Sequence, residues 1–129
     1  MDQATFNDFV TETIGDTAQL LKVKGGEYAG SEDRLANFKR GATLTGVTPL
    51  QCAFIYASKH YDAIATFVRD QAAGVRRERS ESIEGRFDDL INYCILMKAL
   101  VREASPSKYS QPPIGEPVIW NPGVPSASA

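Results

Sequence analysis

The sequence places one carboxylate where a helix normally carries an apolar side chain. Between Ser80 and Glu103 apolar residues recur with a helical period, and Asp89 projects onto the same line as Tyr93 and Leu96. An inward-facing carboxylate needs a cation or hydrogen-bond donors beside it. Asn92 follows within one helical turn. We therefore expect Asp89 and Asn92 to open a polar pocket on this helix.

Further acids form two groups that are far apart in sequence but lie on segments expected to pack side by side. Hard divalent cations prefer carboxylate oxygens, and a helical bundle can aim acids from different helices at one point. Helix caps and solvated helix faces explain the same acids without any metal, and spacing alone favours that simpler interpretation. The candidate acids are Glu27, Glu32 or Asp33, Glu84, Asp88 and Asp89.

Basic side chains accompany these acids along the same predicted helix faces. A metal flanked by cations neutralises a triphosphate during attack at phosphorus. Two simpler interpretations stay open, since His60 also suits a hydrogen-bonded core position and Lys59 suits a surface position with a buried stem. The candidates are Lys24, Lys39, Lys59, His60 and Arg86.

The elements that must position these residues are predicted to be helices. The first runs from Thr5 to Lys24 and is weakened or ended by Gly25-Gly26. The second begins at a Ser31 cap, carries Arg34 on its outer side and ends near Gly46.

The third helix has the clearest start signal. Thr48, Pro49 and Gln51 form a capping-box pattern, and the helix should reach about Asp70. His60 projects onto the middle of its apolar face. The basic run that follows, from Gln71 to Arg79, is interpreted as a solvated connection.

The fourth helix is predicted to start at a Ser80 cap and to turn one apolar stripe toward the core. That stripe comprises Ile83, Phe87, Leu90, Ile91, Cys94, Met97 and Val101. The fold class is therefore all-α, a bundle of about four main helices. Residues 1–104 form this helical domain, and residues 105–129 form an extended Pro/Ser-rich tail.

The composition and net charge argue against several classes of protein. A net charge of −2 argues against a protein that tracks nucleic-acid phosphates. Cys52 and Cys94 have no metal-ligand spacing and are expected to be reduced core residues, and no stretch is apolar enough to cross a membrane. A cytoplasmic location follows as the expectation, and a helix-turn-helix interpretation is weak because its second helix would carry few cations.

Three segments carry a family resemblance. In order they read KGGEYAGSEDRLANFK from Lys24, GVTPLQCAFIYASKH from Gly46 and IEGRFDDLINY from Ile83. Together they resemble small phage and bacterial proteins related to the MazG-like, all-α nucleoside triphosphate pyrophosphohydrolases. The resemblance covers roughly residues 20 to 103.

The resemblance implies a homo-oligomer, a dimer or a tetramer, that holds Mg²⁺ or Mn²⁺ and splits a nucleoside triphosphate into a monophosphate and pyrophosphate. Carried over to this sequence, the catalytic acids are Glu27, Glu32 and Asp89. The metal acids are Glu27, Glu32, Glu84, Asp88 and Asp89, and the substrate-binding residues are Lys24, Lys39, Lys59, His60, Arg86 and Asn92.

Two other functions stay open at this level. Because the acids are irregularly spaced, the same pocket suits a phage protein that sequesters a nucleotide without cleaving it. The remaining alternative is a structural helical protein whose acids are only caps.

Overall fold

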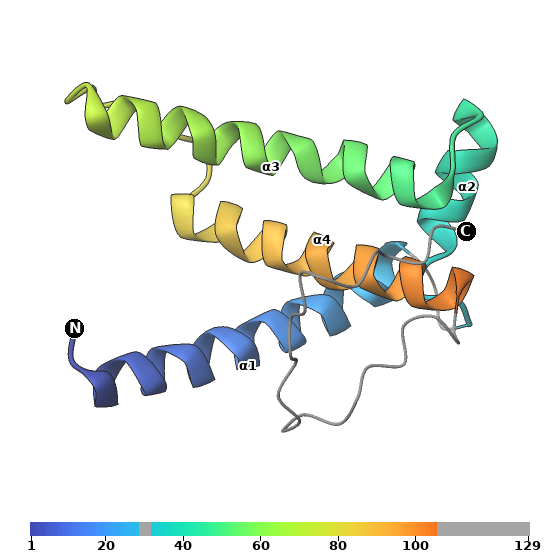
Figure 1. Ribbon diagram of the computed structural model, residues 1–129, viewed down its shortest axis with the longest axis horizontal. Helices are drawn as coiled ribbons and strands as arrows, with labels where there is room; N and C mark the ends of the chain where they lie inside the picture. The colour runs from blue at the N-terminus through green and yellow to red at the C-terminus, as the bar shows by residue number, and fades with distance from the viewer. Residues whose placement is uncertain (29–31, 106–129) are drawn as a thin grey trace, which may run out of the picture.

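The computed structural model describes residues 1–28 and 32–105, and these form four helices and no strand. The helices are α1 (Gln3–Tyr28), α2 (Ala36–Thr45), α3 (Pro49–Ala72) and α4 (Ile83–Ala104). α3 and α4 run side by side along the molecule, and α2 closes one end (Figure 1). The predicted all-α bundle is confirmed, whereas the tail beyond Ser105 lies outside the described residues.

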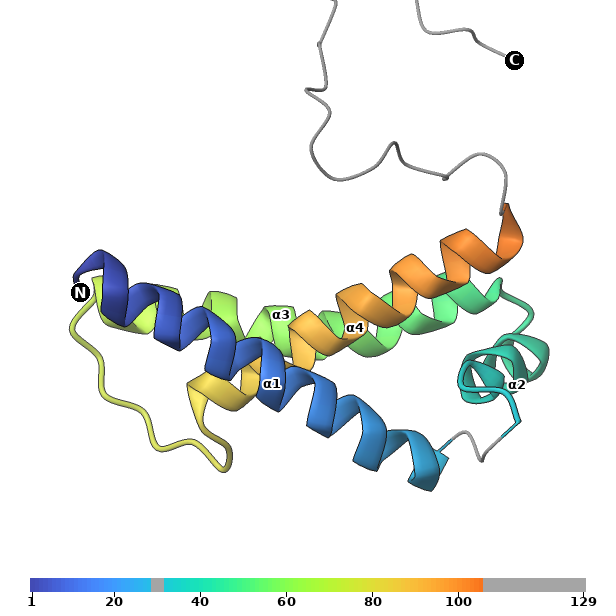
Figure 2. The same cartoon turned by 90° about the horizontal axis from the view of Figure 1, so that it is seen from below.

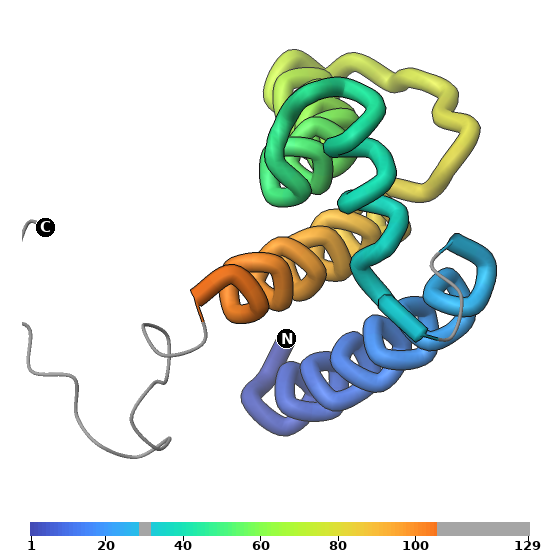
Figure 3. Tube along the Cα trace, turned by 90° about the vertical axis from the view of Figure 1, so that its right-hand side faces the viewer, coloured from blue at the N-terminus to red at the C-terminus, as the bar shows by residue number. Residues whose placement is uncertain are grey.

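α4 is the central element of the bundle. It packs against α3 on one side and α1 on another, as the end-on view shows (Figure 3). The core where these helices meet α2 is centred on Phe38, which is 1% exposed. Its other buried members are Leu35, Ala53, Leu96 and Leu100. None of the described helices is long and apolar enough to span a membrane.

The first helix ends later than the predicted Lys24, because the paired glycines do not end it. α1 continues through Gly25 and Gly26 to Tyr28 and crosses α4 (Figure 2). Gly25 is buried, and a Cβ there would lie 2.7 Å from Nε of Arg34. Arg34 Nη2 in turn donates to the Leu21 carbonyl at 3.2 Å. A glycine inside a helix costs roughly 1 kcal/mol relative to alanine. At Gly25 the close packing of Arg34, which a side chain there would prevent, offsets this cost.

α2 starts later than predicted. Ser31 lies outside the described residues, and the helix begins at Ala36 with no side-chain cap. Asp33 instead accepts a hydrogen bond from the Leu35 amide at 2.9 Å, just before the helix. The predicted C-terminal end is confirmed, because Gly46 adopts the left-handed conformation with φ 72°.

The start of α3 follows the predicted capping box. The Gln51 amide donates to the Thr48 hydroxyl at 3.1 Å, and the Thr48 amide donates to the Gln51 side chain at 2.9 Å. Pro49 occupies the first turn, where its missing N–H costs nothing. The cap of α4 differs from the prediction: Ser82, not Ser80, accepts from the Gly85 amide at 3.0 Å.

The face of α4 predicted to point inward is not the buried one: none of its seven residues is buried, and three of them are exposed. Phe87 and Ile91 of the predicted stripe are 45% and 38% exposed, and Ile95 beside them is 44% exposed. The buried positions are Asn92, Leu96 and Leu100, on the line that runs through Asp89. Cys94 is correspondingly exposed, whereas Cys52 is buried and both thiols are free.

Candidate functional site

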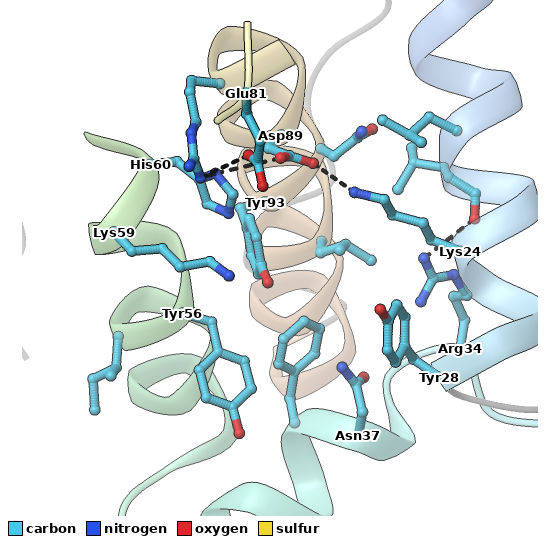
Figure 4. A pocket seen from close by; sticks show the side chains of 17 residues that line it. Lys24, Tyr28, Arg34, Asn37, Tyr56, Lys59, His60, Glu81, Asp89 and Tyr93 are labelled. Carbon is cyan, nitrogen blue, oxygen red and sulfur yellow. Dashed lines mark hydrogen bonds and ion pairs between the residues drawn. The ribbon is translucent and has the colours of Figure 1, made fainter. Parts of the chain in front are cut away.

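A cavity of about 520 Å³ opens between α1, α3 and α4, with the start of α2 at its end (Figure 4). This volume lies within the range that small-molecule sites occupy in proteins. Its lining is rich in charged and polar side chains. They are Lys24, Tyr28, Arg34, Asn37, Tyr56, Lys59, His60, Glu81, Arg86, Asp89, Asn92 and Tyr93.

Asp89 is the centre of the polar contacts in this cavity. Lys24 reaches it from α1 with Nζ 2.7 Å from Oδ1, and His60 faces it from α3 with Nδ1 3.4 Å from Oδ2 (Figure 4). The hydrogen bond to Asp89 raises the pKa of Lys24, against a smaller opposing effect of burial. The inward-facing carboxylate therefore has cationic and hydrogen-bonding partners from two other helices.

His60 is buried and has two competing partners for one nitrogen. Its Nδ1 lies 3.4 Å from Asp89 and 3.5 Å from Nη1 of Arg86. Nδ1 can donate to Asp89 in one tautomer or accept from Arg86 in the other, but not both at once. Burial lowers the pKa of His60, while the nearby Asp89 opposes that shift. The neutral form of the ring is therefore favoured. A ligand that contacts Asp89 or Arg86 would change which of the two is the hydrogen-bond partner of Nδ1.

Two side-chain amides on the cavity lining have polar atoms without partners. Asn92 is 6% exposed, and neither its Nδ2 nor its Oδ1 is hydrogen-bonded to the described residues. The Oδ1 of Asn37 is also buried without a hydrogen-bond partner among the described residues. A buried unsatisfied polar group costs about 1–3 kcal/mol. Such groups are rare in native structures and call for a ligand or water as partner.

The cavity has an excess of positive charge. Lys24, Arg34, Lys59 and Arg86 line it, against the acids Asp89 and Glu81. Arg86 binds Glu81 at 3.0 Å, whereas Arg34 and Lys59 form no ion pair with any described residue. A concave site lined by one sign of charge concentrates the opposite ion. This cavity therefore favours an anionic ligand.

Aromatic rings flank the charged groups. Tyr28, Tyr56 and Tyr93 contribute to the lining (Figure 4), and the ring of Tyr93 lies 5.5 Å from that of His60. Burial raises the pKa of Tyr93. The rings give the cavity flat apolar surfaces beside its cations, an arrangement on which a nucleobase can stack.

Six of the residues predicted from the sequence come together in this cavity. They are Lys24, Lys59, His60, Arg86, Asp89 and Asn92. His60 is both buried and part of the cavity, so the two interpretations of it are compatible. Lys59 is exposed overall and still contributes to the lining.

The other predicted residues lie outside the cavity. Glu27 and Glu32 are exposed near the end of α1, and Glu84 is exposed in the first turn of α4. Asp88 faces α1 in a shallow depression beside Asp16. Lys39 binds Asp33 and Glu103, each at 2.9 Å. One helical step of 100° separates Asp88 from Asp89, so the two acids point in different directions.

The predicted metal acids do not converge in the part of the chain that the structure describes. There, no three His, Cys, Asp or Glu side chains are grouped as a metal site requires. Within the cavity, Asp89 is already paired with Lys24 and His60. Mg²⁺ or Mn²⁺ therefore stays a prediction from the resemblance.

Sequence reasoning missed several residues of the cavity. Arg34 was predicted on an outer face, but it turns inward against the buried Gly25. Asn37 and Glu81 had no signal, since each lies in or beside a helix whose start was misplaced. The unbroken α1 could have been expected only if the glycine contact with Arg34 had been known.

No known protein family, no curated protein and no solved structure matches this chain.

Proposed function

We propose that this protein binds a nucleotide in the cavity between α1, α3 and α4. The observation that carries the proposal is the meeting of four cationic side chains with only two acids in one concave site. The phosphates would contact Lys59, Arg86 and the ammonium of Lys24. Arginine and lysine donors bind phosphate oxygens through charge-assisted hydrogen bonds.

The base end of the nucleotide would lie among the tyrosines and amides. Tyr28 and Tyr56 offer stacking surfaces, and Asn37 and Asn92 offer unpaired polar atoms. Hydrogen bonds to a base edge would remove the cost of leaving those atoms unsatisfied. This division of the cavity supports a nucleotide over inorganic phosphate alone.

The first test is calorimetric titration with ribonucleotides and deoxyribonucleotides, each as mono- and triphosphate, in EDTA. We expect at least one nucleotide to bind without a metal. Lys59→Ala should weaken that binding roughly 10–100-fold, the usual effect of losing one hydrogen bond to a charged group. Lys22→Ala is the matched control, because Lys22 is exposed on α1 and outside the cavity. A folded protein that binds no member of the panel would disprove the proposal.

Hydrolysis of a nucleoside triphosphate to monophosphate and pyrophosphate is the second candidate. Asp89 favours it, since a carboxylate inside a cavity with an excess of cations can accept a proton from attacking water. Under this proposal Mg²⁺ or Mn²⁺ would be the cofactor, as the resemblance implies. The homo-oligomer and the cytoplasmic location also belong to this proposal.

Asp89→Asn separates the two candidates. In a binding protein the substitution removes a negative charge that faces the phosphates, so the affinity in EDTA should rise by about tenfold. In an enzyme it should abolish pyrophosphate release in the presence of Mg²⁺ or Mn²⁺. Pyrophosphate formation by the wild-type chain, lost in this variant, would establish the second candidate over the first.

A further inference from the structure

The outward face of α4 carries apolar side chains that the other described residues leave wholly or partly exposed. Phe87, Leu90, Ile91, Cys94 and Ile95 line a shallow groove there with Lys98. Their spacing of three and four residues is that of the seam in a pair of packed helices. This face, defined by these residues, is called the α4 strip below.

Charged residues at the two ends of α4 share the direction of the strip. At 100° per residue, Glu84, Ile91, Ile95 and Arg102 project within about 40° of one another. Glu84 lies in the first turn and Arg102 in the last. Neither of these charges, nor that of Lys98, is in an ion pair with another described residue. The strip is therefore negative at its start and positive toward its end.

We propose that the α4 strip binds the same strip of a second copy of this chain, with the two α4 helices antiparallel. A two-fold axis that crosses the strip at the level of residue 93 would place Glu84 opposite Arg102 of the second copy and Ile91 opposite Ile95 of the second copy. Each pair occurs twice, as a symmetric interface between identical chains requires.

The charges select this direction over the alternative. In a parallel pair Glu84 would face Glu84 and Arg102 would face Arg102, and like charges repel. The antiparallel pair also buries the centre of the strip, where an isolated chain leaves Ile91 and Ile95 exposed to water. This proposal does not depend on what the cavity binds, because the strip is centred on the side of α4 away from Asp89.

The expected strength is modest. A single pair of helices buries less than the roughly 800 Å² per partner of a typical stable interface. We therefore expect a dimer that dissociates on dilution in the micromolar range.

The test is sedimentation velocity on the full chain from low to high micromolar concentration. Glu84→Arg and Arg102→Glu should each weaken the dimer by roughly tenfold, since each places like charges opposite one another twice. The double variant should restore it. Asp62→Arg, an exposed charge change on α3, is the control that should leave the dimer unchanged. Circular dichroism verifies that every variant is folded.

Cys94 gives an independent readout, because the proposed axis lies one residue from it. A short bifunctional maleimide should link two wild-type chains and should fail with Cys94→Ser, while Cys52 is buried and should not react. The proposal would be overturned if the double variant dimerised no better than the single variants. It would also be overturned if the wild-type chain were monomeric at every concentration. A third result would also overturn the proposal: a monomeric chain in which Cys94 is protected from the maleimide, with that protection lost when residues 106–129 are removed. In that case the tail, and not a second copy, covers the α4 strip.

Discussion

Two carboxylates of this protein have cationic neighbours, yet their surroundings differ. Asp70 accepts from Nε and Nη2 of Arg77 at 2.8 and 3.0 Å, and from Nη2 of Arg79 at 2.8 Å. Asp89 is held by one short contact to Lys24 and a longer one to His60. The Asp70 side chain is 9% exposed, and that of Asp89 is 17% exposed.

The surroundings show which acid is structural. Asp70 has its oxygens occupied by arginines, and Arg79 also lies 5.1 Å from the centre of the Phe67 ring. Together these contacts tie the connection after α3 back onto the helix. Asp89 instead faces a cavity in which Asn92 lacks partners. An acid whose hydrogen bonds are complete stabilises a fold, whereas one in an incompletely paired cavity has capacity left for a ligand.

The largest effect on folding is expected from Asp70→Asn. The substitution leaves Arg77 and Arg79 without the charge that binds them, so the melting temperature should fall by several degrees. Trypsin should then cut the loosened connection faster. Asp62→Asn is the control on the same helix, because Asp62 is exposed and forms no ion pair with the described residues.

The pH dependence of stability provides a second measurement of the structural role of Asp70. The hydrogen bond from Arg77 lowers the pKa of Asp70 below the ordinary value of about 3.9. Its stabilisation is therefore present above that value and is lost as the pH falls through the folded-state pKa. Unchanged melting temperature and acid sensitivity in the variant would contradict a structural role for Asp70.

A smaller change of opposite sign is expected from Asn92→Leu. Leucine is close to asparagine in shape and removes two buried polar atoms without partners, so the free energy of unfolding should rise by about 1–3 kcal/mol. Nucleotide binding should weaken at the same time. Thermal melts and calorimetry measure the two effects, and a loss of stability would mean that Asn92 already has partners in the folded chain.

The smallest expected effect concerns His60. Burial lowers its pKa, so His60 favours folding above the ordinary value of about 6.5 and loses that contribution as the pH falls through the folded-state pKa. A phosphate nearby would raise this pKa, and binding should therefore take up protons. Affinity should increase as the pH falls, by at most about tenfold per pH unit for one proton.

Calorimetry in two buffers of different protonation enthalpy measures that uptake. His60→Gln should bind with no proton exchange from this position and with a flatter pH profile. An equal number of protons taken up by the variant and the wild type would assign the uptake to another group.

Local signals in the sequence predicted much of the fold. The capping box at Thr48 and Gln51 and the glycine end at Gly46 are confirmed, because both depend on residues within a few positions of each other. The end of α1 was predicted too early, at Lys24, since the helix passes through Gly25 where Arg34 packs against it. The cap of α4 was misplaced by two residues, because Ser80 and Ser82 offer the same side chain.

The sequence by itself determined that the chain is helical and that Asp89 points inward. Periodicity reports these features directly, because a helix turns each residue by a constant angle. Only the tertiary structure decided that the cations Lys24 and Arg34 turn toward the cavity and that Glu27 and Glu84 do not. It also decided which apolar face of α4 is buried. Both choices depend on where neighbouring helices lie, and helix periodicity alone does not specify the direction of packing.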